Sequence, residues 1–227
     1  MSSIPSSMRR PDPTFIAGAI LVVVTLLAAA VMAHHPTVGR TPDLVQSVRR
    51  IAALSRPSAW VHGTLIALLL VTLHCLFEFA STRGFARPLV RSGAIAYATG
   101  AVVMIGAALV SGFVIADVAS LVPHETPVDL QIVHALLILC GILNQACANF
   151  GAIAMSAGIG LWSLDLLRDR GLIRLVGMLG CVIGLVPVIA LPIGAIHLDV
   201  HGMLGVVLLQ ALWNLAIAAL LLRARAG

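Results

Sequence analysis

Charged side chains are scarce in this sequence. Only 10% of its 227 residues are Asp, Glu, Lys or Arg, whereas soluble globular domains carry roughly 25%. Apolar residues make up 60% of the chain, and the mean hydropathy is +1.06. A chain of this composition cannot cover itself with an ordinary water-exposed surface, so the composition predicts an integral membrane protein.

Lysine is absent altogether, and all 14 basic residues are arginine. The net charge of +5 would suggest nucleic-acid binding in a soluble protein. Here the arginines lie between long apolar runs, where membrane topology explains them better. We therefore expect the lipid bilayer as partner, together with other membrane subunits or further copies of the chain, and no nucleic acid.

Familiar catalytic motifs are also missing. The sequence has no Gly-rich phosphate loop, no HExxH, no GxSxG and no CxxC. Its four cysteines all lie inside apolar runs, where free cysteine behaves as a small buried apolar side chain. These absences leave the reaction, if there is one, unidentified.

Six apolar runs are long enough to cross a bilayer, whose hydrocarbon core is about 30 Å thick. The longest uncharged run, Leu130 to Leu164, would span roughly 50 Å as a helix. We predict an all-α, polytopic bundle of six transmembrane helices over residues 15–222, with a polar N-terminus (1–14) and a tail (223–227). The expected spans lie near 15–33, 59–80, 94–116, 131–164, 174–196 and 201–222. The first could be a signal peptide ending at Ala33, but its length favours a retained helix.

The arginines predict the orientation of the bundle. Ten of them fall on the side that holds both termini: Arg9, Arg10, Arg83, Arg87, Arg91, Arg168, Arg170, Arg174, Arg223 and Arg225. The other side holds Arg40, Arg49, Arg50 and Arg56 with most of the acids. The positive-inside rule therefore places both termini in the cytoplasm, in a bacterial-type inner membrane. After the first span, Thr41-Pro42-Asp43 precedes a short amphipathic helix, which suits the membrane interface.

Histidine is distributed unevenly with respect to this topology. Seven of the eight fall at the outer ends of spans or in outer loops, and only His74 lies deeper: the seven are His34, His35, His62, His124, His134, His197 and His201. Imidazoles brought together from several helices can hold a metal ion or haem. We predict a site near the outer face with His62, His134, His197 and His201 as ligands, and His34 and His35 as further candidates. Alternatively, each histidine simply suits the interface, with an apolar body and a polar tip.

Three spans carry a polar pair four residues apart, which places both members on one helical face. The pairs are His74 with Glu78, Gln145 with Asn149, and Gln210 with Asn214. We interpret the amides as hydrogen-bonding groups between the fourth and sixth spans, and His74 with Glu78 as a pair near the inner interface.

The sequences His62-Gly63, His134-Ala135 and His201-Gly202 are similar to cytochrome b561-type proteins, whose spans also carry His before a small residue. The resemblance implies haem b, but it departs from that family on the inner side, where only His74 is available. Three functions follow as expectations. The first is binding of haem or of a transition metal, zinc or copper, for electron transfer or metal handling. The second is a non-catalytic accessory subunit or small carrier, and the third is a zinc-dependent lipid hydrolase with Asp199 or Asp129 as base.

Overall fold

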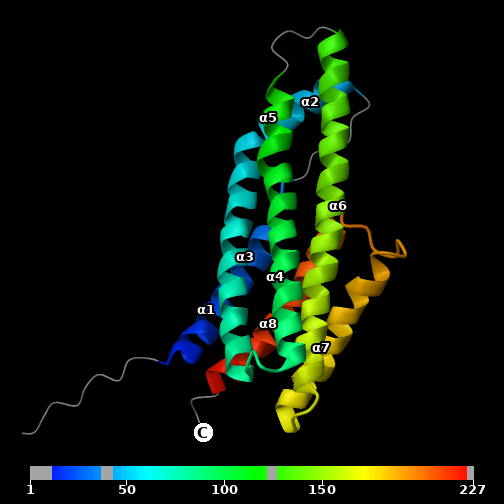
Figure 1. The fold of residues 1–227 in the computed structure, drawn as a ribbon. Coiled ribbons are helices and arrows are strands. Elements are labelled where there is room, and N and C mark those ends of the chain that lie inside the picture. Colours follow the sequence, from blue (N-terminus) through cyan, green and yellow to red (C-terminus); the bar gives the residue numbers. More distant parts are fainter. Residues whose placement is uncertain (1–11, 37–42, 122–126, 224–227) are drawn as a thin grey trace, which may run out of the picture.

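The structure, a computed structural model, describes residues 12–36, 43–121 and 127–223. Arg9, Arg10, Arg40, His124, Arg225 and most of the predicted terminal segments lie outside these ranges. The described part is helical (Figure 1), with the elements α1 (Pro13–Ala33), α2 (Leu44–Ala53), α3 (Ser55–Arg83), α4 (Pro88–Leu109), the π-helical turn η1 (Val110–Val114), α5 (Ile115–Ser120), α6 (Pro127–Leu166), α7 (Gly171–Ala190) and α8 (Val200–Arg223).

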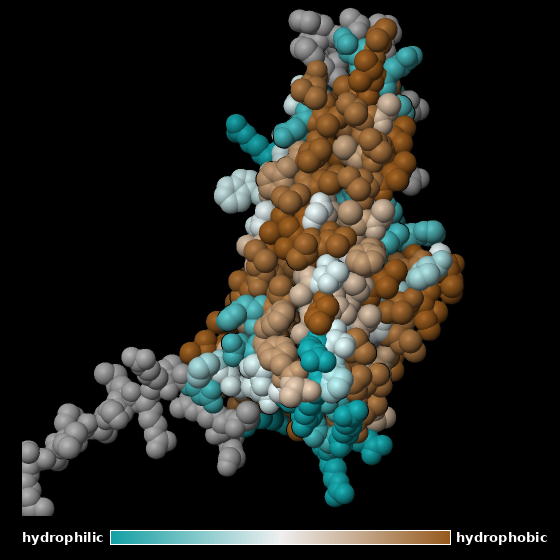
Figure 2. Space-filling view, in the orientation of Figure 1, coloured by the Kyte–Doolittle hydropathy of each residue, from teal (hydrophilic) through white to brown (hydrophobic). Residues whose placement is uncertain are grey.

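Six of the described helices are long and apolar enough to cross a membrane, as the sequence predicts. One of the six is continuous through α4, η1 and α5, from Pro88 to Ser120. Brown, apolar side chains cover most of the face shown in Figure 2, while teal side chains gather mainly at its two ends. This outward-facing apolar surface is typical of a protein surrounded by lipid.

The six long helices form a closed ring. Each packs against the next along the chain, α1 on α3, α3 on α4, α4 on α6, α6 on α7 and α7 on α8, and α8 returns to pack on α1. The interior of the ring therefore receives side chains from helices at both ends of the sequence.

The helices differ greatly in length. At about 1.5 Å per residue, the 40 residues of α6 span roughly 60 Å, whereas α1 and α7 span about 30 Å. In Figure 1, α3, α5 and α6 extend above the other helices, and α2 lies across them there. Asp43 caps α2 by accepting a hydrogen bond from the Val45 N–H at 3.0 Å, and Val48 of α2 packs with Ala119 of α5 and Val133 of α6. The expected amphipathic helix thus directs its apolar face onto protein.

The fifth long helix ends earlier than the sequence predicts. α7 stops at Ala190, three residues after Pro187, whereas the expected span reaches residue 196. Proline lacks an N–H and its ring opposes the preceding turn, and Pro192 follows shortly. The chain turns at Gly194, whose φ of +71° favours glycine. This early end leaves residues 191–199 as a connection that reaches the mouth of the ring.

Glycines let α4 and α6 approach closely. A Cβ added at Gly100 would lie 2.7 Å from the Gly151 carbonyl oxygen, and one at Gly158 would lie 2.8 Å from the Gly93 oxygen. Both helices begin this contact with the same four residues, Gly-Ala-Ile-Ala, at 93–96 and at 151–154. Small residues at such contacts are the usual means by which membrane helices pack.

Candidate functional site

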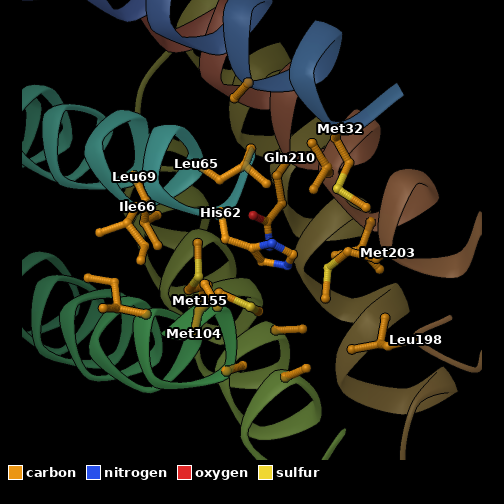
Figure 3. A pocket seen from close by; sticks show the side chains of 18 of the residues that line it. Met32, His62, Leu65, Ile66, Leu69, Met104, Met155, Leu198, Met203 and Gln210 are labelled. Atoms are coloured by element: carbon orange, nitrogen blue, oxygen red, sulfur yellow. The ribbon is translucent and has the colours of Figure 1, made fainter. Parts of the chain in front are cut away.

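The ring encloses a cavity of about 250 Å³ near the level at which α1 ends and α8 begins (Figure 3). Its walls come from α1, α3, α4, α6 and α8 and from the residues on either side of these helices. Along α3 it extends from His62 to Thr72, about 15 Å by helical rise. Most of the lining is apolar, so the few polar groups decide what the cavity can bind.

An aromatic cluster closes the lower end of the cavity. Tyr97 lines the cavity and packs against Trp162, with ring centroids 5.4 Å apart. Trp162 stacks on Trp213 at 5.8 Å, and Phe79 meets both edge-on. The Trp162 indole N–H donates to the Val90 carbonyl oxygen at 3.0 Å. Trp162 and Trp213 are thus packing residues, while Trp60 is 77% exposed on α3.

His62 is the buried histidine of the site, with 6% of its surface exposed. Its Nδ1 lies 2.8 Å from the carbonyl oxygen of Ser58, one turn earlier on α3. The Ser58 hydroxyl lies 3.3 Å from the same nitrogen and donates to the Ser111 carbonyl oxygen at 3.4 Å. The imidazole packs directly on Gly112, where an added Cβ would collide with the His62 Cβ. Gly112 lies within the π-helical turn, a feature often found at functional sites.

His35, just after α1, completes a pair with His62. The two Nε2 atoms are 3.3 Å apart, and the rings meet nearly at right angles, at 85°. The Nδ1 of His35 lies 2.9 Å from the carbonyl oxygen of Pro36. Burial lowers the pKa of His35 below its usual 6.5, and the contact with Pro36 opposes this only in part.

The hydrogen bonds of this pair determine where its protons lie. A carbonyl oxygen can only accept, so Nδ1 of each ring must carry the hydrogen. In the neutral rings both Nε2 atoms then carry a lone pair and no hydrogen, although they lie only 3.3 Å apart. Two such acceptor atoms repel each other unless an electron-pair acceptor lies between them. The arrangement therefore suits a shared proton or a metal ion.

The other predicted ligands lie elsewhere. His134, on α6, borders a separate hollow with Leu44, Val48 and Ile51 of α2. His34, His197 and His201 are exposed, and Nδ1 of His34 lies 2.8 Å from the Ala30 carbonyl oxygen. Within the part of the chain that the structure describes, no three side chains of His, Cys, Asp or Glu come close enough to hold a metal. Only His35 and His62, of the predicted six, are brought together.

The carboxylate between the last two histidines borders the same cavity. Asp199 accepts a hydrogen bond from the Gly202 N–H at 2.8 Å, and this bond lowers the pKa of the Asp199 carboxyl. The bond fixes Asp199 at the start of α8.

The polar pairs behave differently from one another. Gln210 of α8 donates to the Ser156 hydroxyl of α6 at 3.3 Å, so a hydrogen bond joins the two spans, but its partner on α6 is Ser156 and not the predicted Gln145 or Asn149. Gln145 instead donates to Asn149 of its own helix, at 3.1 Å. His74 is exposed and forms no ion pair with Glu78, both being described residues.

Two buried oxygens are directed into the cavity region. Thr25 and Asn214 line the cavity and are 3% and 7% exposed. Thr25 Oγ1 and Asn214 Oδ1 have no hydrogen-bond partner among the described residues. Buried polar atoms of this kind are usually satisfied, so these two offer contacts to an occupant.

An ion-pair cluster that no sequence pattern predicted lies at the lower end of the bundle. Arg83 donates through Nε and Nη2 to Asp165 Oδ2, at 3.1 and 2.8 Å, and its Nη2 also lies 2.6 Å from Asp169 Oδ2. Arg87 contacts Asp165 at 3.1 Å. Asp165 is only 1% exposed. Its position at the end of the longest uncharged run was the available signal, but its partners lie 82 and 78 residues away.

Comparisons with known proteins gave no match: no protein family, no curated protein and no solved structure is significantly similar to this chain.

Proposed function

We propose that this chain is a multi-pass membrane protein that binds a transition-metal ion near the outer membrane face, for metal handling, through Nε2 of His35 and His62. The observation that carries this proposal is that the two Nε2 atoms lie 3.3 Å apart while Nδ1 of each ring contacts a backbone carbonyl oxygen. Two nitrogens held tetrahedrally by one metal, each about 2.05 Å away, are also about 3.3 Å apart. Donation of the remaining ring N–H to a backbone carbonyl is the usual arrangement of metal-binding histidines.

The membrane setting supports the same assignment. By the positive-inside rule we assign to the cytoplasm the end that holds the described arginines Arg83, Arg87, Arg91, Arg168, Arg170, Arg174 and Arg223. Arg83 and His62 are 21 residues apart on α3, about 32 Å, which is close to the thickness of the hydrocarbon core. With both termini cytoplasmic, the histidine pair lies at the outer boundary, where an ion can arrive from outside the cell.

A bare ion fits the pair better than haem does. Axial ligands lie on opposite sides of the haem iron, so their nitrogens would be about 4 Å apart at metal–nitrogen bonds near 2.0 Å. The cavity, at about 250 Å³, is also smaller than the roughly 300–1,000 Å³ typical of pockets for larger ligands. A zinc hydrolase would need a third protein ligand, so the pair favours metal handling over hydrolysis.

Metal analysis of the purified full chain tests the proposal. Protein in detergent, stripped with a chelator, is incubated with Zn(II), Co(II) or Cu(I), desalted, and its metal content measured by mass spectrometry. We expect one ion per chain for at least one metal, and its loss in both His35→Gln and His62→Gln. His74→Gln, an exposed histidine on the same helix as His62, is the control and should bind like the parent protein.

Stoichiometric binding that survives both substitutions would overturn the assignment of the site. No binding of any metal would favour an accessory membrane protein whose histidine pair shares a proton.

A further inference from the structure

Methionine gathers in the cavity. Of the five methionines in the described part of the chain, four line it: Met32, Met104, Met155 and Met203, from α1, α4, α6 and α8. The fifth, Met178, is 53% exposed on α7, which contributes no side chain to the lining. Methionine often fills gaps in an apolar core, but here four separate helices direct a thioether into one space that also holds a histidine pair.

Two of these thioethers lie at the end of the cavity where the histidines are. Met32 is three residues before His35, at the end of α1, and Met203 is in the first turn of α8. Figure 3 shows Met32 and Met203 on the side of the cavity toward which the His62 ring points. Met104 and Met155 lie together on the other side of that ring. The two imidazoles and these two thioethers therefore line the same cavity, with Met32 and Met203 on the side toward which the His62 ring points.

The chemical type of these ligands favours one class of metal ion over another. Imidazole and thioether are neutral, and thioether is a soft ligand that selects copper(I) over the harder divalent ions. Zinc sites use three or four ligands drawn from His, Cys, Asp and Glu, and the described residues bring no three of these together here. A single positive charge is also less costly to bury among neutral donors than a double one.

We propose that the ion is copper(I), bound by Nε2 of His35 and His62 and by the thioether sulfurs of Met32 and Met203. This inference rests on the proposed function, because it names the ion for the same site. Met104 and Met155 provide further thioethers deeper in the cavity, between the histidines and the aromatic cluster.

Competition for copper(I) tests this inference. The detergent-purified full chain, kept reduced with ascorbate, competes with the coloured copper(I) chelator bathocuproine, and zinc affinity is measured in parallel with a zinc indicator. We expect copper(I) to bind at least 100-fold more tightly than Zn(II). The double variant Met32→Leu/Met203→Leu should lose at least tenfold in copper(I) affinity, because leucine keeps the volume but lacks the sulfur.

Met178→Leu is the matched control and should bind copper(I) like the parent protein. The X-ray absorption spectrum of the copper-loaded chain should contain sulfur neighbours, and these should diminish in the double variant only. Elution as a single species in size-exclusion chromatography and an unchanged melting temperature identify variants that still fold.

The outcomes separate the inference from the proposed function. Tighter binding of Zn(II) at His35 and His62, with no effect of the methionine substitutions, would overturn copper(I) and leave the histidine site intact. Absence of any metal binding by the parent protein would overturn both the copper(I) inference and the proposed function.

Discussion

At the scale of single residues, the most constrained charge is Asp165. Its carboxylate is almost fully buried and is neutralised by Arg83, the last residue of α3, and by Arg87, just before α4. Removing one partner of a buried ion pair leaves the other charge uncompensated, which typically costs 3–5 kcal/mol. Because Arg83 retains Asp169, the cost here should lie at the lower end of that range.

We therefore expect Asp165→Asn to lower the free energy of unfolding by about 3 kcal/mol. The carboxylate of Asp169 is more exposed, so Asp169→Asn should lower the free energy of unfolding by less than half as much. Thermal melting of both variants in the same detergent compares them. Equal melting temperatures for the two would contradict a dominant role for Asp165.

His35 gives the stability of the metal-free protein a pH dependence. Because burial lowers the pKa of His35 in the folded state, the unfolded chain binds a proton at this residue first as the pH falls through 6.5. Folding is then disfavoured increasingly below pH 6.5, until the folded protein also binds the proton. The neighbouring ring of His62, 3.3 Å away, adds repulsion when both are charged.

The melting temperature of the chelator-treated protein should accordingly fall between pH 7.5 and pH 5.5. In His35→Gln the fall should be smaller, since glutamine does not titrate. A variant whose melting temperature falls as steeply as that of the parent would refute this explanation.

At the scale of elements, the π-helical turn η1 positions the site. It lies opposite the first turns of α3 and presents Gly112 to the His62 ring. A methyl group at Gly112 would lie 2.8 Å from the His62 Cγ, too close for ordinary packing. The histidine would have to move, and overpacking of this kind typically costs 1–3 kcal/mol.

We expect Gly112→Ala to weaken metal binding at least tenfold while the protein still folds. Gly106→Ala, one to two turns earlier in the same helix, is the control because nothing lies within 4 Å of its added Cβ. Both are measured by metal titration and melting. Unchanged binding in Gly112→Ala would show that the packing of His62 on η1 does not matter.

The elements themselves were largely predictable, and the site was not. Apolar runs and prolines predict six long helices, because hydropathy is a local property of the sequence. The pairing of His35 with His62 depends on how α1 packs on α3, which no local pattern encodes. For the same reason Arg83 and Arg87 gave no indication of Asp165. His134 is the eighth residue of α6, as His62 is of α3. However, the first residue of α6 that lines the cavity is Asn144, ten positions after His134, so equal positions in two helices did not give equal heights.

At the scale of the whole molecule, the proposed topology makes a direct prediction. Green fluorescent protein fused after Gly227, or inserted after Ala86, should fluoresce, because both sites are assigned to the cytoplasm. Alkaline phosphatase fused after Ala195, between α7 and α8, should be active because that connection is assigned to the outer side. Active phosphatase at Gly227 would invert the orientation and place the histidine pair on the cytoplasmic side.

The ring also explains why the cavity is built from both ends of the chain. Since α8 packs on α1, the closure of the bundle brings Met203 and Met32 to one mouth although 171 positions separate them. Neither half of the sequence contains all four of the proposed donors, so the proposed copper site would form only when the last helix is in place.

The two imidazoles are 27 positions apart in the chain, one just after α1 and the other on α3. An ion held by both would therefore act as a removable cross-link, fastening the end of α1 to the start of α3 and closing a loop that contains α2. Such a clasp restricts the chain in the way a covalent bridge does, but it opens whenever its occupant leaves. The fraction of chains with metal bound and the stability of the packing among α1, α2 and α3 would then increase and decrease together.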